Sequence, residues 1–175
     1  SMPVKTTAAK RTGAKPKIKV ARATPCLWFD GEAEQAAEFY TSVFAGSRIK
    51  KVQHYGEAGP GKKGSVMLVE ATVAGQDLML LNGGPEFPQT EAFSLHLACK
   101  TQEEIDTLWE GLSEGGSKSV CGWVKDRWGV SWQVEWAGMD RLMAKDPATA
   151  DRVFAAMLKM TKIDIAELKA AAKGA

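Results

Sequence analysis

The chain has 175 residues, 45% of them hydrophobic, and a formal net charge of +2. This length fits one domain or two small fused modules, and the six tryptophans are enough for a packed core. The three cysteines, Cys26, Cys99 and Cys121, cannot all pair with one another, and two of them lie in apolar strand-like runs. This favours a reducing, cytoplasmic location with buried thiols. No apolar run approaches the roughly 18 residues of a membrane span, so we expect neither a membrane segment nor a signal peptide.

The basic residues are concentrated in one segment. Residues 1–22 hold seven lysines and arginines and no acid, whereas the rest of the chain holds 16 basic and 21 acidic residues, a net charge of −5. The segment has no apolar periodicity, so we predict a disordered basic tail over residues 1–22. Its charge allows non-specific contact with nucleic acid or anionic lipid, but a solubilising extension explains it more simply. Apart from a contact through this tail, we expect no nucleic-acid partner.

The first predicted unit is a strand followed by a helix and three more strands. Residues 24–30 are a short apolar run that predicts a buried strand. Apolar residues at three- and four-residue spacing then predict an amphipathic helix over residues 32–44, with Asp30 as its cap and Gly46 as its stop. The three further strands are predicted at residues 48–55, 66–73 and 77–81.

The second predicted unit begins in the same way. Residues 92–99 predict a strand, and Thr101 with Glu104 forms a capping box at the start of an amphipathic helix. Residues 121–136 hold four of the six tryptophans and predict a hairpin whose turn places Gly129 at positive φ. After this turn apolar and polar residues alternate, so the last strand has one apolar and one polar face.

Beyond residue 136 the pattern becomes helical. Asp146 before Pro147 is typical of a helix N-terminus, and residues 163–168 begin a last short helix. The helices predicted over residues 141–175 carry more apolar side chains than two compact modules need. We therefore expect them to pack on the sheets or on a second subunit, and we predict a homodimer.

The two strand–helix units are related by an internal repeat. A shift of 69 positions places the first unit on the second from the start of the strand to the end of the helix, so that Tyr40 falls on Trp109 and Gly46 on Gly115. Such self-similarity predicts two related α+β modules, βαβββ followed by a shortened βαββ. Two such sheets leave a concave surface between them, where the polar faces of the strands converge.

Four short motifs occur in this order: PCLWFDGEAEQAAEFY at residues 25–40, LNGGP at 81–85, CGWVKDRWGVSWQ at 121–133 and KIDI at 162–165. Together they resemble the PhnB-like branch of the vicinal oxygen chelate (glyoxalase/bleomycin resistance) superfamily. This branch is commonly labelled the 3-demethylubiquinone-9 3-methyltransferase domain. The resemblance implies an α+β fold of tandem βαβββ-type modules over residues 23–140, the glyoxalase/bleomycin resistance/dioxygenase fold, followed by a helical extension over residues 141–175.

The resemblance also indicates where a metal would bind. The superfamily holds its metal on the concave face with one side chain from each of four strands, and by position these fall near Pro25, Met79, Ser94 and Gln133. Proline and methionine offer no ligand for a hard metal, serine is a poor ligand, and a single glutamine binds weakly. We therefore predict no catalytic metal and no other cofactor. A Rossmann-type S-adenosylmethionine site is not expected either, because no Gly-rich turn leads from a first strand into a helix.

Alternation along the strands selects the residues of the predicted ligand-binding face. Ser94 and His96 share a face of one strand, and Ser131 and Gln133 share a face of another. The resemblance implies that the strand before the helix pairs with the last strand of its module, so we expect His96 and Gln133 to lie side by side. The residues predicted to contact a ligand are Ser94, Gln133, Ser131, Met79, Trp123 and Cys121. The apolar walls are expected to come from Met79, Leu81, Leu27 and Phe29.

Two functions fit this face. The first is binding of a small molecule in the cleft between the modules without a metal. The alternative is an enzyme, methyltransferase or lyase-like by its family label, in which His96 is the catalytic acid or base. Cys121 near His96 is either a nucleophile or a buried inert thiol. Glu135 is a further candidate base, although its place near the end of the strand predicts a solvated carboxylate.

Overall fold

The computed structural model describes residues 2–4 and 13–174. Residues 1, 5–12 and 175 lie outside the described residues, and so does part of the predicted disordered tail. Within the described part of the tail, residues 13–22 contain no helix or strand and are exposed. A search of the described residues found no helix that is long and apolar enough to span a membrane.

The first module is a four-stranded sheet with one helix against it. Its elements are β1 (Cys26–Phe29), α1 (Ala33–Val43), β2 (Arg48–His54), β3 (Val66–Val73) and β4 (Gln76–Asn82). The strand order is β1-β4-β3-β2, in which β1 and β4 are parallel and the other neighbours are antiparallel. The strands and the helix therefore follow the predicted βαβββ order.

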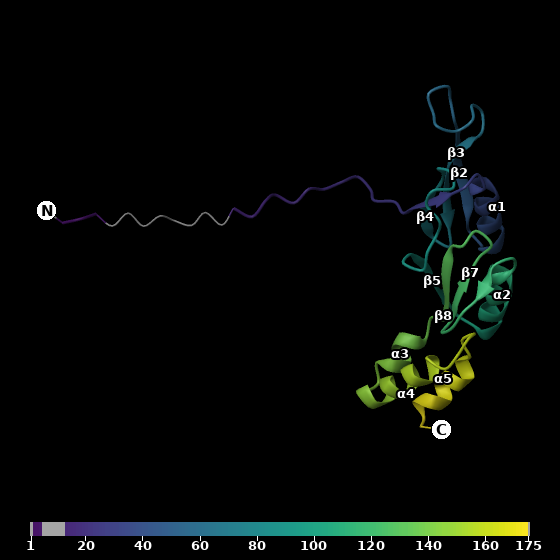
Figure 1. The fold of residues 1–175 in the computed structure, drawn as a ribbon. Coiled ribbons are helices and arrows are strands. Elements are labelled where there is room, and N and C mark those ends of the chain that lie inside the picture. The colour runs from purple at the N-terminus through teal and green to yellow at the C-terminus, as the bar shows by residue number, and fades with distance from the viewer. Residues whose placement is uncertain (1, 5–12, 175) are drawn as a thin grey trace.

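The second module repeats this arrangement with shorter strands. Its elements are β5 (Ser94–Cys99), α2 (Gln102–Ser113), β6 (Ser117–Lys118), β7 (Trp123–Lys125) and β8 (Ser131–Trp136), in the order β5-β8-β7-β6. The fold class of tandem modules with a shortened second module is confirmed, but the predicted βαββ order missed β6. Two strand residues are too few to produce a visible period of two. In Figure 1, α1 and α2 lie on the same side of an elongated molecule.

Three short helices follow the second sheet: α3 (Met139–Met143), α4 (Pro147–Met157) and α5 (Ile165–Ala172). They gather beyond the end of β8, at the bottom of Figure 1. Asp146 caps α4 as predicted, accepting a hydrogen bond from the Thr149 N–H at 2.7 Å. The segment after α4 is bonded to the chain ahead of β7, because the Cys121 and Gly122 N–H groups donate to the carbonyls of Met160 and Thr161.

Each sheet buries one face beneath its helix. Leu27 and Phe29 are each 3% exposed and belong to the core under α1, so their predicted place on the cleft face is wrong. The alternate residue Cys26 is paired in register with Met79, and these two side chains lie on the opposite face. The prediction failed because a strand with apolar residues on both faces gives no period of two from which to choose the buried one.

The two module helices begin in different ways. Thr101 and Glu104 form the predicted capping box of α2, with the Glu104 N–H donating to Thr101 Oγ1 at 3.1 Å. The predicted cap of α1, Asp30, is not used. Instead Asn82, at the end of β4, accepts a hydrogen bond from the Ala33 N–H through its Oδ1 at 2.9 Å. A helix cap that comes from a residue on a distant strand is a tertiary contact, which local sequence does not encode.

One buried carboxylate joins the two modules. Asp126, in the turn between β7 and β8, is 2% exposed. Its Oδ2 accepts hydrogen bonds from the Tyr40 hydroxyl of α1 at 2.5 Å and from Trp132 Nε1 at 3.0 Å. Its Oδ1 accepts from the N–H groups of Trp128 at 2.9 Å and Val130 at 3.0 Å. All four partners are donors, so the group is held as an ionised carboxylate; burial raises its pKa and the hydrogen bonds oppose that rise.

Aromatic side chains surround this carboxylate and extend the junction between the modules. The Tyr40 ring packs edge-on against Trp132 with centroids 5.1 Å apart, and Phe44 stacks on Trp132 at 5.6 Å. Burial and the nearby Asp126 carboxylate raise the pKa of Tyr40, so its hydroxyl stays protonated and remains a donor. Buried residues of both modules and of the C-terminal helices thus form one continuous core.

The Tyr40→Phe substitution tests how much the hydrogen bond between the modules contributes to stability. It removes one donor from a buried carboxylate, so we expect the free energy of unfolding to fall by about 1.5–3 kcal/mol. The measurement is urea denaturation followed by tryptophan fluorescence. Tyr55→Phe is the matched control, because its hydroxyl donates to the neutral carbonyl of Asn82 at 2.6 Å. That control should lose only about 0.5–1.5 kcal/mol. Equal losses would contradict a special role for the buried carboxylate.

Candidate functional site

The face of the second sheet that does not meet α2 forms a cavity with the C-terminal helices. Its volume is about 320 Å³, and we call it the β8 cavity. The sheet side is lined by His96, Ala98, Cys121, Trp123, Gln133 and Glu135. The other side is lined by Trp136 at the end of β8, by Ala137, and by Met139, Asp140, Met143, Phe154 and Met157 of α3 and α4. One wall is therefore a polar strand face, and the other is mostly apolar.

Three of the residues predicted for a ligand site are adjacent on this face. His96 and Gln133 are paired in register across β5 and β8, as expected from the sequence. Gln133 Nε2 donates a hydrogen bond to Ser94 Oγ at 2.9 Å, which fixes the orientation of the amide. The Gln133 side chain is half-buried, whereas His96 is exposed at the sheet edge. Gln133 is thus a fixed part of the wall, and His96 is open to solvent.

Cys121 and Trp123 complete the predicted part of the lining. Trp123 is paired in register with Gln133 across β7 and β8 and is half-buried. Cys121 is half-buried and has a φ of +56°, in the left-handed region that non-glycine residues rarely occupy. Its N–H donates to the Met160 carbonyl at 2.9 Å, which holds this conformation in place. The strained residue therefore lies where the sheet meets the helical wall.

The other two predicted residues lie elsewhere. Ser131 shares the strand face with Gln133 but lines a neighbouring cavity of about 420 Å³ together with Lys125 and Trp123. Its side chain is 1% exposed, and its hydroxyl has no hydrogen-bond partner among the described residues. Met79 belongs to the first sheet and does not line the β8 cavity. A single cleft that contains all the predicted ligand residues is not present among the described pockets.

Glu135 was named as a candidate base, but the prediction that its carboxylate is solvated is wrong. It is only 8% exposed, because the backbone of Gly122 lies against its carboxylate: a Cβ at Gly122 would be 2.7 Å from Glu135 Oε1. Burial raises the pKa of Glu135 to about 7. Within the described part of the chain no hydrogen bond reaches this carboxylate. The sequence signal was Gly122 itself, whose φ of +83° and lack of a side chain make room for the acid.

The residues at the superfamily's metal positions do not fit a metal. Pro25 has no side-chain donor, Met79 lies on the other sheet, and the Ser94 hydroxyl already bonds to Gln133. Nor do the described residues contain any group of three or more His, Cys, Asp and Glu side chains placed to hold a metal ion. No chemical step through a metal follows from these residues.

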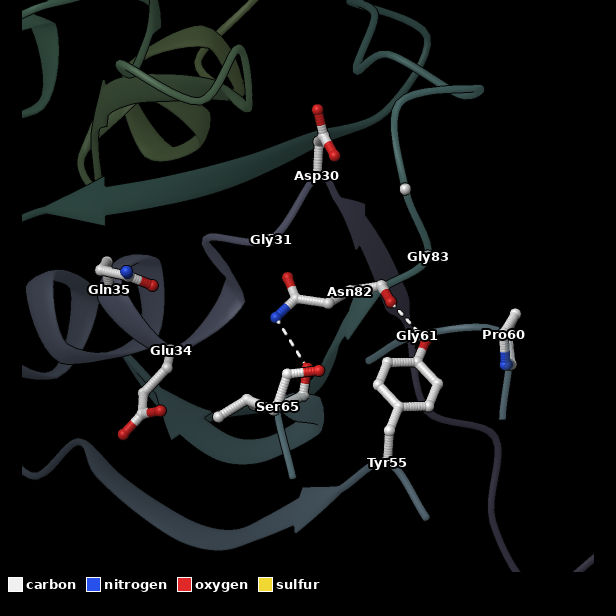
Figure 2. A pocket seen from close by; sticks show the side chains of 12 residues that line it. Asp30, Gly31, Glu34, Gln35, Tyr55, Pro60, Gly61, Ser65, Asn82 and Gly83 are labelled. Carbon is white, nitrogen blue, oxygen red and sulfur yellow. Dashed lines mark hydrogen bonds between the residues drawn. The ribbon is translucent and has the colours of Figure 1, made fainter. Parts of the chain in front are cut away.

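A second pocket, of about 330 Å³, lies in the first module at the start of α1. Figure 2 shows the Tyr55 hydroxyl directed at Asn82 and the carboxylates of Asp30 and Glu34 pointing away from one another. The polar groups in its centre are used within the fold, since Asn82 bonds to the Ala33 N–H and to the Val66 carbonyl. The central amide of this pocket is therefore already partnered within the fold, and its acids do not converge on a common point.

The repeated sheets and helices define a protein of tandem glyoxalase-type modules. The family model described as 3-demethylubiquinone-9 3-methyltransferase matches residues 21–135, more than half of the chain. The chain belongs to this PhnB-like family. The matched residues end before α3, so the helical wall of the β8 cavity lies outside the match.

Solved structures agree with this assignment. The chain is similar to the PhnB protein from Bacillus cereus, with 39% sequence identity and a TM-score of 0.59, over 64% of this chain and 96% of that one. It also shares its fold with protein PA1353 from Pseudomonas aeruginosa, with 24% identity and a TM-score of 0.54, over 65% and 95% of the two chains. A comparison with curated proteins found no match.

The raised pKa of Glu135 makes a prediction about stability and pH. Between about pH 4.5 and 7 the folded protein keeps a proton on Glu135 that the unfolded chain has lost. The free energy of unfolding should therefore decrease as pH rises through this range, by at most about 3 kcal/mol, and then level off. Glu135→Gln removes this dependence, so the variant should be more stable than the natural protein near pH 8, as measured by urea denaturation.

The control is Glu38→Gln, which removes an exposed carboxylate from α1 and should follow the pH profile of the natural protein. The other titratable groups around the cavity are His96, Cys121 and Asp140, and all three are retained in both variants. Parallel profiles for the natural protein and Glu135→Gln would show that this carboxyl group ionises normally and would contradict the prediction.

Proposed function

We propose that the protein binds a small, largely apolar molecule in the β8 cavity without a catalytic metal. The observation that carries this proposal is the cavity itself, which places the polar face of β8 opposite the apolar side chains of α3 and α4. Small-molecule sites usually have this form, with apolar walls and a few placed polar groups. A volume of about 320 Å³ is at the lower end of the usual range and fits a ligand built around one ring.

Two side chains supply polar contacts in this proposal. The Gln133 amide is held by Ser94 and orients a ligand by hydrogen bonding without changing its own charge. Glu135 offers either a proton or a negative charge near neutral pH, because burial raises its pKa to about 7. Trp123 supplies a flat apolar surface beside them. Specificity would come from these three residues, and affinity from the apolar area.

Proton-transfer catalysis is the second candidate function. A general acid or base works best when its pKa lies near the working pH, and burial gives Glu135 that property. His96 remains in the cavity lining, but it is exposed, so Glu135 is the better candidate for the acid–base role. The family is named after a methyltransferase, but the fold of this chain does not favour methyl transfer. Each sheet has only one parallel pair, unlike the parallel sheet of a Rossmann-type S-adenosylmethionine site.

The proposal includes a cytoplasmic homodimer. All three cysteines are free, which suits a reducing compartment. The face of the first sheet that does not meet α1 carries the half-buried apolar side chains Trp28, Met79 and Leu81. A second copy of the chain that covers this face would remove them from water.

A cavity-filling variant tests ligand binding. Ala98 is exposed at the floor of the β8 cavity, so Ala98→Trp should occupy the ligand space. We expect the natural protein to bind the neutral probe tert-butylbenzene and Ala98→Trp to lose at least about ten-fold in affinity. Tryptophan fluorescence titration measures both. Ala45→Trp, at an exposed position outside this cavity, should bind normally. Absence of binding to the natural protein would contradict the proposal.

Light scattering tests the homodimer separately. The natural protein should have the mass of a dimer at micromolar concentration, and Met79→Lys should convert it to a monomer by placing a charge on the proposed contact face. Glu38→Lys, at an exposed position of α1 on the opposite side of the sheet, is a control that should remain dimeric. A monomeric natural protein would contradict the proposal.

A further inference from the structure

The charge of the β8 cavity has one sign. Glu135 lies in its sheet wall and Asp140 in its helical wall. The thirteen described lining residues include no lysine or arginine, and His96 is the one basic side chain among them. The cavity is therefore an acidic space inside a mostly apolar enclosure. An anionic ligand would be repelled by Asp140 and, once Glu135 has lost its proton, by Glu135 as well.

Glu135 is the group that most needs a partner. It is 8% exposed and lies against Gly122, and no hydrogen bond to its carboxylate is present among the described residues. A buried ionised carboxylate without an opposite charge is costly. The described wall supplies no side chain that offsets it. Any cation that enters the cavity and fits beside Glu135 would relieve this cost.

The other lining side chains also suit a cation. Trp123, Trp136 and Phe154 present aromatic rings, whose faces attract positive charge. Trp136 already does so within the chain, because Lys169 Nζ lies 5.5 Å from its ring centroid. Three methionines complete the apolar wall, and their flexible, polarisable thioethers adapt to ligands of different shape.

We infer that the ligand of the β8 cavity is a small organic cation, an amine or quaternary ammonium carried on an apolar group. Its positive charge lies beside Glu135, and its apolar part contacts Trp123 and the methionines of α3 and α4. This inference rests on the proposed binding function and adds the ligand's charge to it. Asp140 and the methionines lie outside residues 21–135, so the match to the family model does not itself imply this preference.

The test compares two probes of the same shape. Phenyltrimethylammonium is permanently charged, and tert-butylbenzene is its neutral isostere. Calorimetric titration of the full chain at about pH 8, where Glu135 is mostly ionised, should show the cation binding at least about ten-fold more tightly. Glu135→Gln should remove most of this difference by weakening the cation and leaving the neutral probe unchanged. Normal binding of tert-butylbenzene also shows that the variant is folded. Asp140→Asn should weaken only the cation, by a smaller factor.

The outcomes separate the ligand charge from the binding function. If tert-butylbenzene binds and the cation binds no more tightly, the charge inference fails and the proposed function stands. If neither probe binds, both fail. Glu38→Gln removes the same charge from an exposed position of α1, outside the cavity. If it weakens the cation as much as Glu135→Gln does, the attraction is a general charge effect and the inference is overturned.

Discussion

The fold depends on one buried carboxylate with four hydrogen-bond donors. Asp126 belongs to the hairpin turn of the second module, and one of its donors, the Tyr40 hydroxyl, comes from the helix of the first. Leaving any lone pair of a buried carboxylate without a donor is costly, so the two modules keep one relative placement. This placement puts Tyr40, Phe44 and Trp132 in one core and leaves the polar face of β8 free for the cavity.

Local sequence predicted those parts of the fold that are determined by neighbouring residues. The capping box at Thr101 and the Asp146 cap follow from the spacing of a few residues. The pairing of β5 with β8 joins distant segments and was predicted from the family resemblance. The features that sequence missed depend on distant segments. Asn82 caps a helix 49 residues earlier in the chain. Glu135 is buried by Gly122 and by helices that follow it, so alternation alone could not show that its carboxylate is shielded.

The site is built from two parts of the chain, and the family match covers only one of them. The family match ends at residue 135, and it contributes the sheet wall with Gln133 and Glu135. The helices that follow contribute Asp140, Phe154 and three methionines. Backbone hydrogen bonds from Cys121 and Gly122 to the segment after α4 keep the two walls together. Membership of the family therefore describes the scaffold, while the chemistry of the cavity also depends on residues outside the match.

The junction between the modules has a consequence for the internal repeat. The shift of 69 positions that relates the modules places Trp109 where the first helix has Tyr40. The turn of the first module that corresponds to Asp126 is Ala74–Gly75, which has no carboxylate. The hydrogen bond therefore has no symmetric counterpart. A chain made of two first modules, or of two second modules, would lack either the acid or the phenol. The halves are similar in shape but are no longer interchangeable.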